Sequence, residues 1–521
     1  MKINPIMLEV LQNKFSSIAE EMGVTLGRTA FSANIKERKD FSCALFDGSG
    51  DMIAQAAHIP VHLGSMPLSV KAAIAGGDLA EGDMVMLNDP FRGGTHLPDI
   101  TVVAPVFTGH NSPSFFVANR AHHADVGGMS PGSMPLSTCL FQEGIVIPPV
   151  KIVETGRIDD KLMRFLLSNV RTPSEREGDF AAQIMANHTG VSRMLELVGK
   201  YGRETVQFYA EGLMDHAEMV MRKTIEAIPD GVYRFEDRMD DDGLGAEDVK
   251  VRVTVEIAGD RAEIDFTASD AQVKGSINAV RAITVSAVLY VFRSLVKEQA
   301  PTNEGCLRPL SIRTRRGTVV DAEFPAAVAG GNVETSQRIV DVLLGALAQA
   351  LPGDVPAASQ GTMNNLVIGG YDPQRARHFT YYETIAGGMG ATAVGAGERA
   401  VHSHMTNTLN TPVEALEYAF PFLVREYSIR KGSGGDGRFR GGDGVVREIQ
   451  LLCDAEVTVL SERRGYPPYG LCGGGPAAAG RNLLIKKGVR CERPGKFREE
   501  LNAADVIRIE TPGGGGYGKA E

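Results

Sequence analysis

Apolar residues at the start of the chain recur at the spacing of a helix. They are separated alternately by three and four residues, at Leu8, Leu11, Phe15, Ile18 and Met22. This spacing places them on one face of a helix, which we expect to pack against the core. Asn4 followed by Pro5 is typical of a helix start, with Asn as the N-cap and Pro in the first turn. Gly23 is expected to end or loosen this helix.

Shorter apolar runs separated by turn residues predict two hairpins in the first part of the chain. Residues 41–46 and 52–57 flank Asp47-Gly48-Ser49-Gly50, which favours a tight turn. Residues 100–106 and 114–118 are two further apolar runs with a turn between them. We expect this second pair to form an antiparallel hairpin as well.

The rest of the chain alternates between helical and strand patterns. Periodic apolar residues predict helices through most of 157–228, and again near 282–297 and 334–350. Strands at 251–257 and 262–266 are separated by a Gly-Asp turn. We therefore expect a mixed α+β fold with several layers. Its regions are an N-terminal α/β region (1–156), a helical segment (157–230), a second α/β region (231–352) and a glycine-rich, mainly β region (353–521).

The composition is that of a large, mildly acidic globular protein. Of 521 residues, 43% are apolar and 23% are charged, and the net charge is −10. This balance argues against nucleic acid or an anionic membrane as a partner, because no basic excess is present to neutralise phosphate groups. No run of about 18 apolar residues predicts a membrane span, and the N-terminal sequence has no signal-peptide core. The six cysteines are widely scattered, so we expect a reducing, cytoplasmic compartment.

Glycine-rich stretches dominate the last third of the chain. Residues 432–437 formally match G-x-G-x-x-G. A dinucleotide site needs a strand before this motif and a helix after it, but more turn residues follow here, so we reject that interpretation. No G-x-x-x-x-G-K-[ST] motif occurs, so the sequence indicates no phosphate-binding loop. Four consecutive glycines at 513–516 are expected to form a loop or a mobile tail.

Histidines and aspartates gather just outside the two strands of the second predicted hairpin. They are Asp89, His96 and Asp99 on one side and His122, His123 and Asp125 on the other. If the strands pair, both groups lie side by side at the end opposite the turn. Imidazole and carboxylate together suit Zn, Mn or Fe(II). A metal site is therefore one interpretation, and ordinary turns with hydrogen-bonded histidines are the other.

Three polar residues earlier in the chain also leave alternatives open. Asp40 follows a charged stretch and is either buried near the site or exposed, and the sequence favours exposure. His58 and His62 are four residues apart, but Pro60 between them argues against one helical face. These two histidines form either a polar wall of a pocket or a loop with hydrogen-bonded side chains.

Several blocks of sequence together resemble a known family over nearly the whole chain. The blocks are Arg38-Lys39-Asp40-Phe41-Ser42 and residues 58–66, 88–99, 121–128, 331–337, 404–408 and 440–444. They resemble the hydantoinase B family, which comprises the B subunits of ATP-dependent hydantoinases and lactamases, the matching half of 5-oxoprolinase, and the alpha subunit of acetone carboxylase. The resemblance implies a hydantoinase B-like fold with the metal site in its N-terminal β region.

The resemblance also implies roles for individual residues. The implied metal ligands are Asp40, His96, Asp99 and one histidine of the adjacent pair, with His122 favoured. His123 and Asp125 would have a catalytic role, either supporting the metal ligands or relaying a proton. His58 and His62 would contact the substrate, and Asp89 would orient His96 or its loop. The metal would be Zn, Mn or Fe, and it would lower the pKa of water to near 7.

In such a family the work is divided between two subunits. The resemblance implies a separate hydantoinase A-like, actin-fold partner that binds ATP and phosphorylates the substrate, in an (αβ)2 heterotetramer. This chain would then be the metal-dependent hydrolytic subunit of an ATP-dependent cyclic amidase, opening a hydantoin, lactam or 5-oxoproline ring. The alternative is a subunit of a ketone carboxylase, which the considerably shorter length of this chain disfavours. A scaffold without a metal is a third hypothesis.

Overall fold

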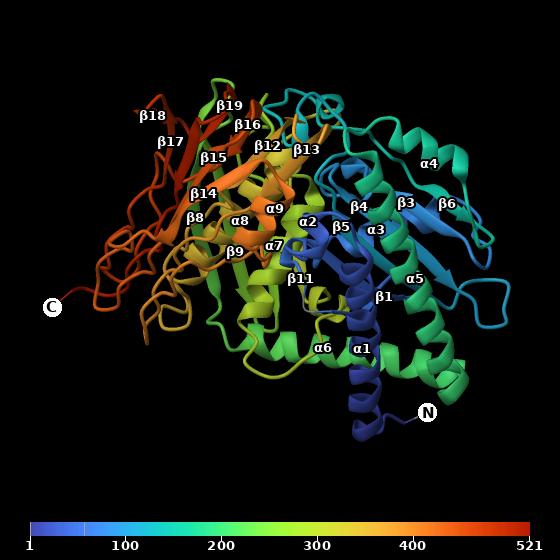
Figure 1. Ribbon diagram of the computed structural model, residues 1–521. Coiled ribbons are helices and arrows are strands. Elements are labelled where there is room, and N and C mark those ends of the chain that lie inside the picture. The colour runs from blue at the N-terminus through green and yellow to red at the C-terminus, as the bar shows by residue number, and fades with distance from the viewer. Residues whose placement is uncertain (1, 57, 521) are drawn as a thin grey trace.

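The protein is described by a computed structural model that covers residues 2–56 and 58–520 (Figure 1). Helices and strands are mixed along the chain, so the predicted α+β class is confirmed. Among the described residues, none of the helices combines the length and the apolar composition needed to cross a bilayer.

The first helix, α1 (Pro5–Thr29), begins as predicted. The side chain of Asn4 accepts a hydrogen bond from the backbone N–H of Ile6, and the apolar stripe of the helix is buried. The predicted end at Gly23 is wrong, because α1 continues for six residues beyond it. Gly23 instead allows a close approach: a Cβ built there would lie 2.6 Å from Cε1 of His58.

The N-terminal region forms a seven-stranded sheet in the order β2-β1-β5-β4-β3-β6-β7. Its strands are β1 (Phe41–Asp47), β2 (Met52–Gln55), β3 (Met84–Leu87), β4 (Asp99–Val106), β5 (Phe115–His122), β6 (Val150–Glu154) and β7 (Arg157–Ile158). Both predicted hairpins are confirmed, since β1 pairs with β2 and β4 pairs with β5, each antiparallel. The first return strand ends at Gln55, and residue 57 of that prediction lies outside the described residues.

Helices cover both faces of this sheet. The short helix α2 (Ala33–Lys36) leads from α1 into β1, and α3 (Met66–Ala75) packs against β3, β4 and β5. The predicted helical segment contains α4 (Asp160–Leu167), α5 (Pro173–Tyr201) and α6 (Arg203–Glu226). Helix α5 packs along α1 and against β4 and β5 (Figure 1). The strands that carry the predicted site are therefore enclosed by α5 on one side and α3 on the other.

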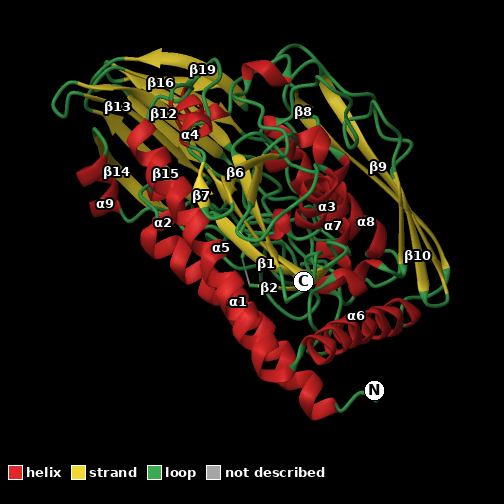
Figure 2. Ribbon diagram, turned by 90° about the vertical axis from the view of Figure 1, so that its right-hand side faces the viewer, coloured by secondary structure: helices red, strands yellow, loops and turns green. Residues whose placement is uncertain are grey.

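The next region forms a four-stranded sheet in the order β11-β10-β9-β8. Its strands are β8 (Gly231–Asp241), β9 (Glu247–Ala258), β10 (Arg261–Asp265) and β11 (Leu310–Arg313), and its helices are α7 (Arg281–Ser294) and α8 (Ser336–Leu347). The predicted hairpin across Gly259-Asp260 is confirmed by the pairing of β9 with β10. Helix α8 lies against β8 and β9, which extend as long strands beside it (Figure 2). A π-helical turn, Gly331–Thr335, precedes α8.

Two antiparallel sheets and the short helix α9 (Val413–Ala419) make up the C-terminal region. Their orders are β13-β12-β16-β19 and β14-β15-β20-β17-β18. The strands are β12 (Asn365–Asp372), β13 (Arg377–Glu383), β14 (Phe422–Ile429), β15 (Val445–Leu451), β16 (Ala455–Leu460), β17 (Arg481–Lys486), β18 (Val489–Arg493), β19 (Lys496–Leu501) and β20 (Val506–Glu510). A shared apolar core lies between the two sheets and includes Leu366, Val457, Ile449 and Ile507.

The glycine-rich stretches of this region form packed loops. Residues 432–437 lead into further loop and not into a helix, as the rejection of a dinucleotide site required. The four glycines at 513–516 are buried, so they form a loop and the tail interpretation is wrong. The N–H of Gly515 donates to the carbonyl of Ala358 at 2.8 Å, and a Cβ on Gly514 would lie 2.0 Å from the carbonyl oxygen of Met389.

A cluster of ion pairs joins the second sheet to the third. We call it the junction cluster; its members are Asp237, Arg338, Asp341, Glu462, Arg463 and Lys496. Asp237 belongs to β8 and Arg338 to α8, whereas Lys496 begins β19. Nη1 of Arg338 lies 3.1 Å from Oδ2 of Asp237, and Lys496 is paired with Glu462. The cluster is largely buried, and it fixes the C-terminal sheets to α8.

Candidate metal centre

Three neighbouring strand ends of the first sheet bring the predicted site together. Asp99 opens β4, His122 closes β5, and the two residues are direct cross-strand partners. Asp40 precedes β1, and its carbonyl accepts a hydrogen bond from the N–H of His122 at 3.0 Å. The two His/Asp groups therefore meet at the end of the β4–β5 hairpin away from its turn, as the hairpin prediction required.

Asp99 is the centre of this group. Its Oδ1 lies 3.0 Å from Nε2 of His96 and 3.1 Å from Nδ1 of His122. Its Oδ2 accepts a hydrogen bond from the hydroxyl of Thr95 at 2.8 Å and lies 3.3 Å from Nε2 of His62. All five side chains are buried. We call His62, His96, Asp99 and His122 the site cluster.

The electrostatics of the site cluster favour an ionised Asp99 beside a neutral His122. Burial raises the pKa of Asp99, but His96, His62 and the hydrogen bond from His122 outweigh it and hold the pKa well below its usual range. Burial lowers the pKa of His122, which favours its neutral form. Neutral imidazole and ionised carboxylate are the forms that bind a metal ion.

The donor set fits a divalent transition metal. His96, Asp99 and His122 each offer one ligand atom, and these atoms lie within 4.8 Å of one another. The Nε2 atom of His122 is buried without a hydrogen-bond partner among the described residues. A buried nitrogen that is left unpaired costs free energy, and a cation beside the cluster would remove part of that cost. Two imidazoles and a carboxylate suit Zn, Mn or Fe(II).

Asp40 is buried, so the expectation that it is exposed is wrong. It lies beside the fully buried guanidinium of Arg38, with Oδ2 3.8 Å from Nη1. Arg38 in turn donates to the carbonyl of Tyr382 and to the hydroxyl of Thr384. These partners lie more than 340 residues away in the sequence, which is why the charged stretch around Asp40 suggested a solvent-exposed loop.

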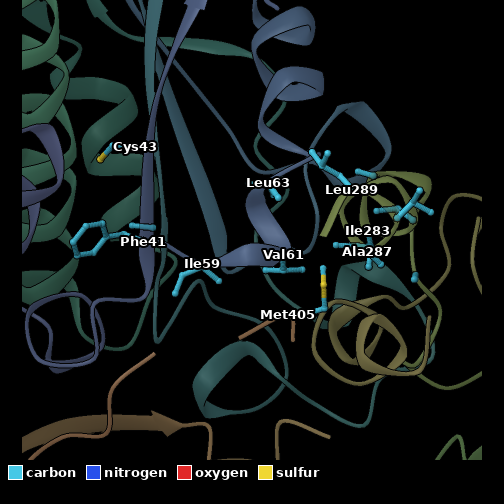
Figure 3. Close-up of a cluster of buried hydrophobic side chains, with 14 of the residues drawn as sticks. Phe41, Cys43, Ile59, Val61, Leu63, Ile283, Ala287, Leu289 and Met405 are labelled. Carbon is cyan, nitrogen blue, oxygen red and sulfur yellow. The ribbon is translucent and has the colours of Figure 1, made fainter. Parts of the chain in front are cut away.

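A narrow cavity lies beside the site cluster. Its polar lining residues are Asp40, His62, Asp99, His122, Asn332, Tyr382, Thr384, Thr406 and Thr408, and its apolar ones include Val61, Met363 and Met405. Figure 3 shows Val61 beside Met405 and the α7 residues Ile283 and Ala287. The N–H of Val61 also donates to the carbonyl of Met405 at 3.3 Å. One wall of the cavity therefore consists of histidines and aspartates that could bind a metal, and the other consists of residues from the C-terminal half of the chain.

Sequence reasoning gave no role to two residues that hold the histidines from this second wall. Asn332, in the π-helical turn before α8, has its Nδ2 3.0 Å from Nε2 of His96. The ring of Tyr382 stacks on His122 with centroids 4.6 Å apart and an interplanar angle of 19°. The hydroxyl of Tyr382 donates to Asn365, whose amide donates to Glu334. Asn332 and Glu334 lie in the 331–337 block, which contributes to the family resemblance. That block did not indicate which residues they contact.

The structure places His123 and Asp125 away from this cavity. His123 follows the last residue of β5 and lies toward α5, where its Nε2–H donates to Gln183 at 3.0 Å and its ring packs on Phe180. Burial lowers the pKa of His123 to about 4. Asp125 accepts hydrogen bonds from the backbone of Gly127 and from the guanidinium of Arg171. Both residues tie the end of β5 to the α5 side of the sheet.

His58 and Asp89 also lie outside the site cluster, whereas His62 belongs to it. The Nδ1 atom of His58 accepts a hydrogen bond from the N–H of Cys43, and its ring packs edge-on against Phe41 in a different cavity beside α1. Burial and, next, the charge of His62 lower the pKa of His58 to about 4. Asp89 accepts from the N–H of Phe91 at 3.0 Å and so anchors the loop that carries His96 without touching His96.

Buried polar residues behind the loop were not foreseen from the sequence. Asn88 donates to the carbonyl of Leu97 and accepts from the N–H of Ile147, which fixes the loop around His96. Glu143 accepts from the N–H groups of residues 328 and 329, and the carbonyl of Ala329 lies 3.4 Å from Nδ1 of His96. Burial raises the pKa of Glu143 to about 7. An isolated Asn or Glu in a loop gives no signal of such contacts.

Comparison with known proteins identifies the family. The family model Hydantoinase B/oxoprolinase matches residues 4–520. The chain belongs to the hydantoinase B/oxoprolinase family. This member is 42% identical over 532 residues to 5-oxoprolinase of Dictyostelium discoideum, covering 100% of this chain and 41% of that protein. It is 31% identical to the putative D-/L-hydantoinase B subunit of Pseudomonas sp. (strain NS671), covering 99% of this chain and 90% of that protein.

Solved structures show the same fold for this family member. The ATP-dependent caprolactamase from Pseudomonas jessenii superposes with a TM-score of 0.93 at 30% identity, covering 100% of this chain and 92% of that one. Acetone carboxylase superposes with a TM-score of 0.91 at 20% identity, covering 99% of this chain and 76% of that one, and so shares its fold. The chain spans only about two fifths of the 5-oxoprolinase that it matches.

Proposed function

We propose that this chain is the metal-dependent hydrolytic subunit of an ATP-dependent cyclic amidase. Its substrate would be a hydantoin, lactam or 5-oxoproline ring that a partner subunit has phosphorylated on the amide oxygen. One observation carries the proposal: Asp99 lies within 3.1 Å of both His96 and His122 at the end of the β4–β5 hairpin, beside a cavity. The names of the relatives, which are a 5-oxoprolinase, a hydantoinase B subunit and a caprolactamase, support the substrate class.

His96, Asp99 and His122 would hold a Zn, Mn or Fe ion, with Asp40 as a further ligand from the same cavity. Such an ion lowers the pKa of water and makes hydroxide available at neutral pH. His62 would hold Asp99 in place and accept a proton, since its Nε2 lies 3.3 Å from Asp99 and its Nδ1 lies 2.8 Å from the hydroxyl of Ser42. We assign structural roles to His123, Asp125, His58 and Asp89, whose contacts lie elsewhere.

The chemistry is a hydrolysis in two steps. The oxygen of water adds to the ring carbon that bears the phosphorylated oxygen. The ring C–N bond then breaks, and the nitrogen leaves as an amine after it gains a proton. The acyl phosphate that results reacts with a second water and gives a carboxylate and inorganic phosphate. Phosphorylation makes this possible, because an unactivated amide is a poor electrophile with a poor leaving group. The residues of the cavity wall orient the ring and exclude competing water.

The partner would be a separate hydantoinase A-like subunit that binds ATP, in an (αβ)2 heterotetramer in the cytoplasm. The match to 90% of a protein named as the B subunit of a hydantoinase supports a separate chain. In 5-oxoprolinase of D. discoideum, by contrast, the matching part is 41% of a longer chain.

The test is ring opening by the chain together with its ATP-binding partner. We expect ATP-dependent conversion of 5-oxoproline, hydantoin or caprolactam into the open-chain product, with phosphate released in equal amount. The Asp99→Asn variant is expected to lose product formation and to keep assembly with the partner. Product formation that survives in Asp99→Asn would overturn the proposal. Activity only on ketones and only with bicarbonate would favour a carboxylase instead.

A further inference from the structure

A buried cation, Arg38, contacts hydroxyl groups that line the same cavity as Asp99. Nη2 of Arg38 donates to the hydroxyl of Thr384 at 2.8 Å and contacts that of Thr408 at 3.4 Å. Its Nη1 donates to Asn34 and to the carbonyl of Tyr382. Arg38 is fully buried, and its Nε atom has no hydrogen-bond partner within the part of the chain that the structure describes. The nearest carboxylate, Asp40, is 3.8 Å away and only weakly paired.

The hydroxyl groups beside Arg38 have at least one proton that is not used in hydrogen bonds among themselves. Thr384, Thr406 and Thr408 all line the cavity. The hydroxyls of Thr384 and Thr408 lie 2.8 Å apart, and those of Thr406 and Thr408 lie 3.5 Å apart. Each hydroxyl carries one proton and two lone pairs, so these two contacts use at most two of the three protons. At least one proton is left to donate to a ligand, and Arg38 polarises the hydroxyls of Thr384 and Thr408, which it contacts.

The charges around the cavity also favour an anion. Asp40 and Asp99 together carry two negative charges, which a divalent ion in the site would balance. Arg38 then remains as an unbalanced positive charge behind the threonines, and a buried unbalanced charge is costly. An oxyanion against the hydroxyls would remove that imbalance.

We propose that Thr384, Thr406 and Thr408, backed by Arg38, form a binding site for the phosphoryl group of the activated substrate and for the phosphate released from it. This inference rests on the proposed function and adds a specific place for the phosphoryl oxygens. The phosphoryl oxygen is bonded to the carbon that water attacks, so the phosphoryl group must lie in the same cavity as Asp99. A substrate carboxylate such as that of 5-oxoproline is a second source of oxyanion, but it is separated from that carbon by the ring.

The two sources are distinguished by binding measurements on the metal-loaded chain. Inorganic phosphate and 5-oxoproline are titrated separately by calorimetry into wild type, into the double variant Thr384→Val/Thr408→Val and into Thr406→Val. Valine keeps the shape of threonine and removes the hydroxyl. The matched control is Thr380→Val, because Thr380 is buried on the same strand as Tyr382 but does not line the cavity.

We expect phosphate to bind wild type and Thr380→Val equally and the double variant at least about tenfold more weakly, since a hydrogen bond to a charged group is worth about that factor. Thr406→Val is expected to weaken phosphate binding to a smaller extent. Metal content should be the same in all four proteins. Unchanged phosphate affinity in the double variant, or selective loss of 5-oxoproline binding there, would overturn the inference and leave the proposed function standing. Wild type that holds no metal would instead overturn the proposed function and this inference with it.

Discussion

Two clusters of polar side chains are buried in this molecule, and they differ in how their charges are matched. In the junction cluster, three cations face three carboxylates: Arg338, Arg463 and Lys496 against Asp237, Asp341 and Glu462. In the site cluster, a single carboxylate, Asp99, is contacted by three histidines. In the first cluster each cation has a carboxylate partner within the cluster. In the second cluster three imidazole rings share one carboxylate, and Nε2 of His122 has no hydrogen-bond partner among the described residues.

The difference shows that burial of charge does not by itself mark a functional site. The junction cluster contains more charge, yet each cation has a carboxylate partner within the protein, so the cluster holds sheets together. The site cluster combines three imidazoles, one carboxylate and an adjacent cavity, and it gains from an added cation. Breaking the first cluster should therefore cost stability, and breaking the second should cost ligand binding.

The largest effect is expected from Arg338→Met, which breaks the junction cluster. Methionine keeps the unbranched aliphatic part of the side chain, but Asp237, Asp341 and Glu462 lose one of their shared cations. Removing one partner of a buried ion pair costs about 3–5 kcal/mol. We expect the free energy of unfolding, measured by urea denaturation, to fall by that amount while metal content per folded chain stays unchanged.

The control for this measurement is Arg313→Met, which removes an exposed pair with Glu263. Such a pair contributes little because solvent screens it, so the unfolding midpoint of this variant should stay close to that of wild type. Equal destabilisation by the two substitutions would contradict the structural role of the junction cluster.

A smaller and conditional effect is expected from Asp99→Asn. A ligand that binds only the folded state stabilises it by about 3–4 kcal/mol when present at 100 to 1,000 times its Kd. Added Zn or Mn should therefore raise the unfolding temperature of wild type and leave that of Asp99→Asn unchanged. Without metal, the two proteins should differ by roughly 1 kcal/mol, the value of a hydrogen bond. A metal response of equal size in the variant would show that Asp99 is not a ligand.

A pH-dependent effect of up to roughly 3 kcal/mol is expected from Glu143, which supports the backbone beside His96. Burial raises its pKa from 4.5 to about 7, so the folded state holds a proton that the unfolded state releases between these values. Stability of wild type should therefore fall as the pH rises from about 4.5 to about 7, by at most about 1.4 kcal/mol for each unit of pKa shift.

The variant Glu143→Gln keeps the acceptor oxygen for residues 328 and 329 and removes the titration. Its free energy of unfolding, followed by urea denaturation of the metal-free chain at pH 5 and pH 7.5, should decrease less than that of wild type. A wild type that becomes more stable over this range, relative to the variant, would contradict the assigned direction.

The local sequence was sufficient to predict the strands that carry the site residues. The apolar runs around a turn predicted the β4–β5 hairpin, and antiparallel pairing then required Asp99 and His122 to lie at the same end. The sequence left the choice between His122 and His123 to the resemblance. The structure shows the physical difference between them: His122, the last residue of β5, lines the cavity, and His123, the next residue, contacts α5.

Contacts between distant segments could not be read from the sequence. Asp40 is buried because Arg38 reaches Tyr382 and Thr384 in the C-terminal half. Gly23 lies inside α1 and not at its end. The ring of His58 packs against it and leaves no room for a Cβ. No local pattern reports such long-range packing, since it depends on how the sheets are arranged around one another.

The measurement that tests the central claim most directly is the metal content of purified wild type beside His122→Ala and His123→Ala. The two variants remove neighbouring, buried histidines, of which His122 lines the cavity and His123 contacts α5, and their unfolding temperatures show whether both remain folded. We predict about one Zn, Mn or Fe per chain in wild type and in His123→Ala, and its loss in His122→Ala. Equal metal in both variants, or none in wild type after expression with its ATP-binding partner, would contradict the claim.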